Sequence, residues 1–190
     1  MLPCVYLVRH GETAWSASGQ HAGPTDIPLT EEGERKARGL RERLKGLTFD
    51  RVFTSPLQRA ARTCTLAGFG AAAKVDPDLL EWDYGDYEGR KTSDILADRP
   101  GWLLFRDGCP NGELPADVAM RADRVITRLR AADDKAIVFS SGHILRVLAA
   151  RWLGLAPSEG RLFELGTASV SILGYEHDKD EPVVALWNSV

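Results

Sequence analysis

Short apolar runs alternate with longer amphipathic runs along most of the chain. The run 4–8 (CVYLV) is continuously apolar, which is typical of a parallel strand buried on both faces. Further strands are predicted at 51–55, 72–76, 135–140, 167–176 and 182–188. The last two are predicted to meet across the sequence HDKDE, so they form a closing pair.

Apolar residues recur at helical spacing between these strands. The helix predicted at 29–47 has Leu40, Leu44 and Leu47 on one face, and Thr30 is suited to cap its start. Further helices are predicted at 56–69, 114–132 and 143–154. This alternation predicts the α/β class, as a three-layer α/β/α sandwich around a mainly parallel central sheet. The closing strand pair is expected to add an antiparallel edge.

The segment 81–113 departs from this alternation. It is polar and aromatic, and glycines punctuate it throughout. Such composition is typical of a functional loop, so we expect a lid or substrate segment with one short helix. No repeat, linker or low-complexity tract divides the sequence, and we expect one domain over residues 1–190.

Composition narrows the classes of partner. The formal net charge of the 190 residues is −3, so no general basic field would recruit nucleic acid or an anionic membrane. The three cysteines are widely spaced and form no C-x-x-C, which argues against a zinc ribbon or a disulfide framework. The N-terminal apolar run is too short for a signal peptide or membrane span, so we expect a cytoplasmic protein.

Polar residues follow three of the predicted strands. Arg9 and His10 end the first, Arg59 and Arg62 lie on the helix after the second, and the sequence SSGHILR follows the strand 135–140. The carboxyl ends of parallel strands share one rim, where such folds bind ligands. Guanidinium groups and helix N-termini bind phosphate. A histidine there could bind phosphate or attack phosphorus.

Several of these motifs, in this order, resemble the histidine phosphatase superfamily, also called the phosphoglycerate mutase-like family. The resemblance begins with LVRHGET and continues through FTSPLQRAARTC, LLEWDYGDYEGRKT, GCPNGE and GHILRVLAARWLG. The Arg-His-Gly triplet alone is weak evidence for the family. The ordered set of motifs covers nearly the whole chain and is specific to the family.

The resemblance implies catalytic roles. His10 would be the nucleophile that forms a phosphohistidine, and Arg9 and Arg59 would clamp the phosphoryl oxygens. Glu81 would be the general acid that protonates the leaving oxygen and later helps water attack. Its aromatic neighbours, such as Trp82, could raise its pKa.

The resemblance also places substrate contacts. The loop GQHAGPTD (19–26) would line the substrate side, with backbone N–H groups from Ala22 and Gly23 and a hydroxyl from Ser16. His21 is expected to be a loop residue or a substrate contact. Separately, Gly11 is expected to permit a close backbone approach beside the nucleophile. Arg90 and Lys91 are candidates for binding a second anionic group.

The sequence departs from the family at its last motif, H-G-x-x-x-R. Aligning Gly142 and Arg146 places Ser141 where a second catalytic histidine is expected, and His143 follows two residues later. Three alternatives stay open: Ser141 donates a hydrogen bond instead, His143 compensates, or catalysis is weakened.

The leading hypothesis is a metal-independent phosphatase that hydrolyses small phosphomonoesters, such as sugar phosphates or bisphosphates, without a cofactor. It resembles sedoheptulose-bisphosphatase-like enzymes and broad acid phosphatases. The alternatives are a cofactor-dependent phosphoglycerate mutase and a non-catalytic phosphate-binding module. The expected partner is a small phosphorylated metabolite, and the apolar C-terminal strands could form a homodimer edge.

Overall fold

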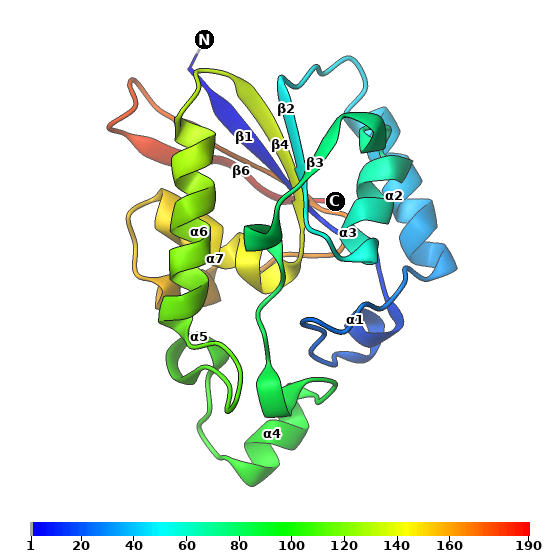
Figure 1. The fold of residues 1–190 in the computed structure, drawn as a ribbon, viewed down its shortest axis with the longest axis vertical. Coiled ribbons are helices and arrows are strands. Elements are labelled where there is room, and N and C mark those ends of the chain that lie inside the picture. The colour runs from blue at the N-terminus through cyan, green and yellow to red at the C-terminus, as the bar shows by residue number, and fades with distance from the viewer. Residues whose placement is uncertain (1) are drawn as a thin grey trace.

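The computed structural model describes residues 2–190, in which one six-stranded sheet is covered by helices on both faces (Figure 1). The strands are β1 (Cys4–Arg9), β2 (Arg51–Thr54), β3 (Ala73–Val75), β4 (Lys135–Ser140), β5 (Val170–Tyr175) and β6 (Pro182–Ser189). Their order is β3-β2-β4-β1-β5-β6. β1, β2, β3 and β4 pair in parallel, whereas β5 is antiparallel to both β1 and β6. The predicted mainly parallel sheet with an antiparallel edge is confirmed.

The helices form the outer layers. They are α1 (Ala14–Ser18), α2 (Glu31–Arg43), α3 (Gln58–Leu66), α4 (Thr92–Asp98), α5 (Leu104–Asp107), α6 (Pro115–Arg130) and α7 (Gly142–Trp152). Short 3₁₀ turns are η1 (Gly70–Ala72), η2 (Pro77–Leu79), η3 (Gly85–Tyr87) and η4 (Pro157–Leu162). Helices α6 and α7 cover one face of the sheet, and α2 and α3 cover the other (Figure 1). This is the predicted three-layer arrangement.

Two apolar clusters fill the spaces between the layers. Leu7 and Val138 belong to the cluster that also contains residues of α6 and α7, such as Val125. Val8 and Phe139, the next residue on each strand, belong to the cluster that also contains Leu40 of α2 and Cys64 of α3. Successive side chains of a strand point to opposite faces, so apolar runs supply both clusters.

Some elements differ from the sequence predictions. The helix predicted at 29–47 ends at Arg43, and the one predicted at 56–69 begins at Gln58. The middle segment contains two α-helices, α4 and α5, and not the single short helix expected. Helix α1 was not predicted, because it is only five residues long and has no buried face. A capping box between Thr13 and Ser16 stabilises its start.

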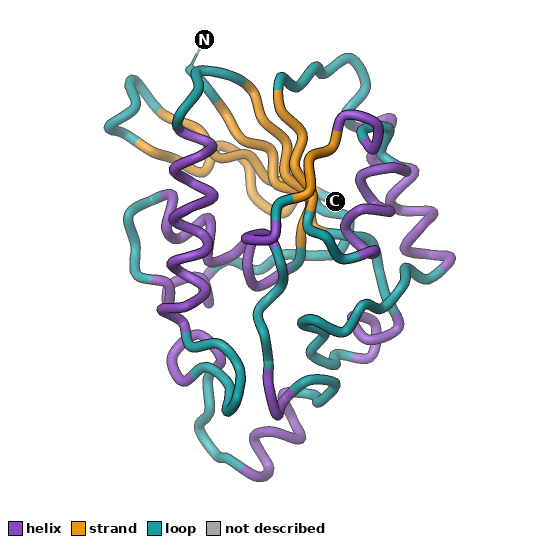
Figure 2. The backbone as a smooth tube through the Cα atoms, viewed as in Figure 1, coloured by secondary structure: helices purple, strands orange, loops and turns teal. Residues whose placement is uncertain are grey.

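The parallel register brings three strand ends to one rim. The His10 N–H donates to the carbonyl of Ser140 (2.9 Å), and the Ser55 N–H donates to that of Phe139 (2.9 Å). The turns after β1, β2 and β4 therefore lie side by side, as the sequence predicts. Figure 2 shows the short helices and loops gathered beyond this end of the sheet. None of the helices within residues 2–190 is long and apolar enough to cross a membrane.

Candidate active site

A small cavity opens beyond the carboxyl ends of β1 and β4, with a volume of about 90 Å³. Most of its wall comes from three segments that are far apart in sequence. Arg9 and His10 contribute from the end of β1, Glu81 from the chain after η2, and His143 from the first turn of α7. One water needs about 10–15 Å³ of such space, so the cavity has room for several waters or a small polar ligand.

The imidazole of His10 is held in one orientation. Its side chain is buried, and Nδ1 lies 2.7 Å from the carbonyl oxygen of Gly11, so Nδ1–H is the donor in this contact. The other ring nitrogen, Nε2, then carries the lone pair. Burial, reinforced by the cations Arg9 and Arg59, lowers the pKa of His10 well below 6.5. His10 is therefore neutral near pH 7, which is the state a nucleophilic imidazole requires.

Arg9 has a buried donor without an acceptor. Its Nη1 donates to the carbonyl of Leu165, whereas Nε has no hydrogen-bond partner within residues 2–190. A Cβ built on Gly142 would lie 3.3 Å from this Nε, so the glycine lets the guanidinium lie close to the start of α7. A buried cationic donor without a partner is costly, and the charge of an anion bound beside Arg9 in the cavity would offset part of that cost.

Arg59 is completely buried and is tied to the loop that precedes α2. Its Nη1 donates to the Thr25 carbonyl (2.9 Å), and its Nη2 donates to the carbonyls of Ala22 (2.8 Å) and Gly23 (2.9 Å). The Nε group lies 3.4 Å from Ser141 Oγ. Most of the donors of Arg59 are thus occupied, and its role as a phosphoryl clamp stays a prediction. Arg62 points elsewhere and pairs with Glu34 at 2.8 Å.

Ser141 and His143 occupy different positions relative to the cavity. Ser141 is fully buried as the N-cap residue of α7, and its hydroxyl makes no capping hydrogen bond. His143 lines the cavity, with Nδ1 at 2.5 Å from the Tyr84 hydroxyl. Burial lowers the pKa of His143 well below 6.5, so it adds a neutral ring. Of the two residues, only His143 reaches the cavity wall.

The carboxylate of Glu81 receives three backbone N–H groups. Oε1 accepts from Trp82 (2.9 Å) and Ile144 (2.9 Å), and Oε2 accepts from His143 (3.0 Å). Two of these donors are in the first turn of α7, where free N–H groups and the helix dipole favour a negative group. Glu81 therefore stabilises the helix start while also facing the cavity.

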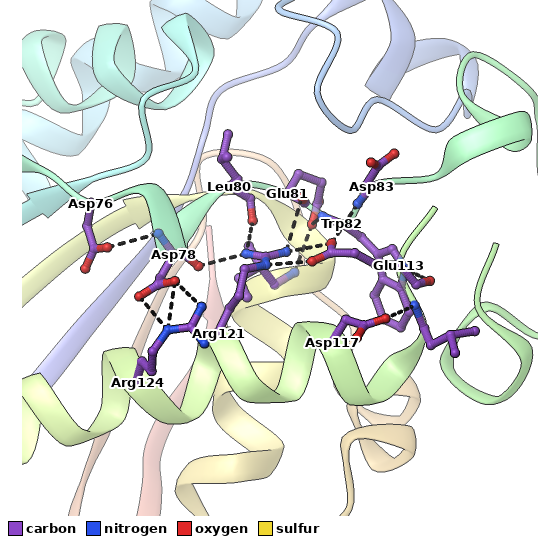
Figure 3. Close-up of polar contacts among 12 residues, drawn as sticks. Asp76, Asp78, Leu80, Glu81, Trp82, Asp83, Glu113, Asp117, Arg121 and Arg124 are labelled. Atoms are coloured by element: carbon purple, nitrogen blue, oxygen red, sulfur yellow. Dashed lines mark hydrogen bonds and ion pairs between the residues drawn. The ribbon is translucent and has the colours of Figure 1, made fainter. Parts of the chain in front are cut away.

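Arg121 of α6 holds the backbone on which Glu81 is carried (Figure 3). Its Nη1 donates to the carbonyl of Leu80 (2.9 Å), and its Nη2 lies 3.4 Å from that of Glu81. The guanidinium also pairs with both carboxylate oxygens of Glu113, and Glu113 accepts from the Asp83 N–H at 2.9 Å. The Arg121–Glu113 pair thus fixes the chain on both sides of Glu81.

The predicted substrate contacts divide into two groups. Ser16 and Ala22 line the cavity. Gly11 and Gly23 do not offer free donors: the Gly11 N–H donates to Thr63 Oγ1 (3.0 Å), and the Gly23 N–H donates to the Glu88 carboxylate. The N–H expected to be free at Gly23 is thus already satisfied by a side chain, and the role of Gly23 in substrate binding stays a prediction.

The close approach expected at Gly11 does occur, but against the protein itself. A Cβ on Gly11 would lie 2.4 Å from the carbonyl oxygen of Gly33. The glycine therefore lets the turn after β1 pack against the first turn of α2, and this contact fixes the backbone beside His10.

Arg90 and Lys91 lie outside the residues that line the cavity. Arg90 forms an ion pair with Asp98 (2.5 Å) and lies over the ring of Tyr87, while Lys91 is exposed at the start of α4. Their expected role in binding a second anionic group gains no support from this placement.

Sequence reasoning predicted no direct contact with the substrate for several residues of the cavity wall, Tyr84 and Arg146 among them. His21, expected as a loop residue or substrate contact, also lines it, with ring centroids 4.7 Å from Tyr84, and burial lowers its pKa to about 4. Arg146 had a usable signal, since it follows Gly142 by one helical turn and therefore shares its face of α7. Tyr84 had none beyond its aromatic neighbourhood.

Within residues 2–190, no group of three or more His, Cys, Asp or Glu side chains is arranged to hold a metal ion.

Comparison with known proteins finds relatives that are named as phosphatases or as probable phosphoglycerate mutases. An acid phosphatase of Mycobacterium tuberculosis is 41% identical over 175 residues, covering 90% of this chain and 86% of that protein. Sedoheptulose 1,7-bisphosphatase of Saccharomyces cerevisiae is 39% identical over 190 residues, covering 82% and 69%. The probable phosphoglycerate mutase GpmB of Cronobacter sakazakii is 35% identical over 182 residues, covering 90% and 85%.

Solved structures with a similar fold cover nearly the whole chain. The product of an open reading frame of Mycobacterium tuberculosis superposes with a TM-score of 0.93 at 37% identity, covering 98% of this chain and 97% of that one. The mycobacterial glucosyl-3-phosphoglycerate phosphatase gives a TM-score of 0.86 at 26% identity, covering 98% and 99%. The sequence model of the histidine phosphatase superfamily (branch 1) matches residues 5–190, and the chain belongs to that superfamily.

Proposed function

We propose that the protein is a phosphatase that hydrolyses small phosphomonoesters, sugar phosphates or bisphosphates among them, through a phosphohistidine at His10. One observation carries the proposal. A neutral, oriented imidazole lines the same small cavity as a guanidinium whose buried Nε has no acceptor and whose other contact is a single backbone carbonyl. Phosphoryl transfer depends mainly on such positioning and on stabilisation of charge.

The reaction would proceed in two steps. In the first, Glu81 carries a proton that it takes up as the substrate binds. His10 Nε2 attacks phosphorus, the bond from phosphorus to the leaving oxygen breaks, and Glu81 gives that oxygen the proton. In the second, Glu81 takes a proton from water as the water oxygen attacks phosphorus, and the phosphorus–nitrogen bond breaks. Inorganic phosphate leaves, and His10 and Glu81 return to their starting states. Arg9 would hold the phosphoryl oxygens throughout.

Ser141 bears on the expected rate. A serine there offers at most a neutral hydrogen bond where a histidine could offer a charged one. Losing one such donor to the transition state typically costs about 2.7–4 kcal/mol, or roughly 10²–10³ in kcat. We therefore expect a reduced kcat and not a loss of turnover, because His10, Arg9 and Glu81 remain around the cavity.

The test is phosphate release from a panel of sugar phosphates and bisphosphates, compared with the His10→Ala variant. Radiolabel from substrate should appear on the wild-type protein as an acid-labile adduct and should be absent from the variant. Full activity in His10→Ala would reject the mechanism. Binding without release from any substrate would favour the phosphate-binding module, for which the placement of Ser141 outside the cavity wall is the motivating observation.

Phosphoglycerate mutase activity is the second enzymatic candidate, favoured by the relatives that carry that name. Transfer requires that the phosphohistidine be shielded from water. The protein should be incubated with phosphoglycerate and the products separated into isomer and free phosphate. A predominance of isomer would replace the phosphatase proposal with the mutase.

A further inference from the structure

Glu88 follows η3 and binds backbone groups of a loop from another part of the chain. Its Oε1 accepts from the N–H groups of Gly23 (2.9 Å) and Thr25 (3.2 Å), and its Oε2 lies 3.0 Å from the Gly23 nitrogen. The side chain is half-buried, and its hydrogen-bond partners within residues 2–190 are these backbone groups. No step of the proposed reaction uses this carboxylate.

The peptide group between Ala22 and Gly23 connects Glu88 to Arg59. Its N–H donates to Glu88, and its C=O, the carbonyl of Ala22, accepts from Arg59 Nη2 at 2.8 Å. A trans peptide is planar, and its N–H and C=O point in opposite directions. The carboxylate that orients this N–H therefore also orients the carbonyl. Because hydrogen bonds in a chain polarise one another, the two charged side chains act on each other through the peptide.

Arg59 depends on the same loop for its position. The carbonyls of Gly23 (2.9 Å) and Thr25 (2.9 Å) also accept from its guanidinium, so the loop supplies three acceptors. The other partner among residues 2–190 is Ser141 Oγ, at 3.4 Å, which is long for a hydrogen bond. A completely buried guanidinium requires negative charge nearby. Glu88 contributes to that charge from the far side of the loop.

The ends of this loop are attached independently of Glu88. The His21 carbonyl accepts from the Gly89 N–H at 2.8 Å, and the Asp26 carboxylate accepts from the Gln58 N–H, at the start of α3, at 2.8 Å. Between these attachments, residues 22–25 are held by Glu88 on the N–H side and by the guanidinium on the carbonyl side. Removal of the carboxylate should therefore release this short stretch and leave its ends in place.

Arg59 acts on the cavity through its charge. After burial and the charge of Arg9, it is the next cause that lowers the pKa of His10. Ala22, which accepts from Arg59, itself lines the cavity. One N–H of Arg59 Nη1 is not used by the contact with the loop. A shift of this guanidinium should therefore weaken the binding of phosphate.

We propose that Glu88 is a positioning residue, which binds the N–H groups of Gly23 and Thr25, directs the loop carbonyls to Arg59, and so keeps that cation beside the phosphoryl site. The proposal rests on the proposed function, since it takes the cavity as the phosphoryl site. It gives the middle segment 81–113 a part in phosphate binding that requires no contact between Glu88 and the substrate.

The experiment measures the affinity for inorganic phosphate by calorimetry. Glu88→Ala should weaken binding by about tenfold or more, because small displacements of a binding group are costly. Glu88→Gln keeps an oxygen acceptor for both N–H groups and should recover part of this loss. The matched control is Asp86→Ala, in η3, whose exposed carboxylate contacts Asn111 and not the loop. The control should stay within about twofold of the wild type.

A double-mutant cycle tests whether Glu88 acts through Arg59. In the Arg59→Met protein, Glu88→Ala should change phosphate affinity by less than about twofold, whereas a further tenfold fall would overturn the proposal. If Arg59→Met binds too little phosphate to measure, the exchange of the Arg59 Nε–H with water, followed by NMR, replaces the cycle. Exchange should be about tenfold faster in Glu88→Ala than in Asp86→Ala, and equal rates would overturn the proposal.

The remaining outcomes separate this proposal from the proposed function. Equal phosphate affinities in Glu88→Ala and Asp86→Ala overturn it, as does a wild type that binds no phosphate. If the wild type binds phosphate but releases none from any substrate, the proposed function fails, and the affinities still decide the role of Glu88. If Glu88→Ala does not fold, Glu88→Gln replaces it, with an expected fall of about threefold.

Discussion

Replacing Glu81 with glutamine should destabilise the fold as well as remove a proton donor. In the structure, the two carboxylate oxygens accept three N–H groups. A glutamine oxygen can keep the two donors at the Oε1 position, from Trp82 and Ile144. The amide nitrogen would then face the His143 N–H, so two donors would meet and one would be left without an acceptor.

The magnitude follows from these contacts. A buried donor left without an acceptor costs about 1–3 kcal/mol. Loss of a negative charge at a partly buried helix start adds about 0.3–2 kcal/mol. The free energy of unfolding should therefore fall by about 3 kcal/mol in Glu81→Gln. The same change should lower kcat by about 10²–10⁴, the usual contribution of a positioned proton donor.

Urea denaturation followed by circular dichroism measures the first effect. The matched control is Glu32→Gln, which removes a carboxylate from the first turn of α2, where the side chain is 41% exposed and pairs with Arg35. An exposed pair contributes at most about 1 kcal/mol. A loss in Glu81→Gln no greater than in Glu32→Gln would refute the assignment of Glu81 as the group that stabilises the start of α7.

Three further predictions concern the site and its support. Ser141→His should raise kcat by up to about 10²–10³ in the phosphate-release assay, since it restores a charged donor; an unchanged rate would mean that the site functions around serine. Gly11→Ala should destabilise the protein by about 1–3 kcal/mol in thermal or urea unfolding, because its Cβ would lie 2.4 Å from the Gly33 carbonyl, whereas Gly39→Ala, with nothing within 4 Å, should not destabilise. Burial lowers the pKa values of His10, His21 and His143 in the folded protein. As the pH falls below about 6.5, these histidines become protonated in the unfolded chain but stay neutral in the folded one, so the unfolded state is favoured. The free energy of unfolding should fall by about 1 kcal/mol for each of these histidines between about pH 6.5 and pH 5.5, and their ring NMR signals should not titrate there. Normal titration of all the histidines would contradict the buried geometry.

The outline of the fold was predictable because its signals are local. The continuous apolar run of β1 and the helical spacing of α2 depend on side chains close together in sequence, and both elements occur near the predicted bounds. The ends were less predictable. The predicted helix at 29–47 ends at Arg43, since a periodic pattern does not reveal where the backbone stops following the helix.

The candidate site was predictable in part. Arg9 and His10 follow a strand, and the order of parallel strands brings that turn beside the one after β4. The direction of each side chain was not predictable. Arg59 turns toward the carbonyls of Ala22, Gly23 and Thr25, which no spacing in the sequence indicates.

The sequence by itself determined the strands and helices, the family, and the serine at position 141, because each is written in neighbouring residues or in an ordered set of motifs. Only the tertiary structure decided which cations share the cavity. Arg90 is engaged by Asp98, whereas Arg146 is held by η4 and Phe105 with donors to spare. Contacts between segments far apart in the chain fix the direction of a long side chain, and such contacts exist only once the chain has folded.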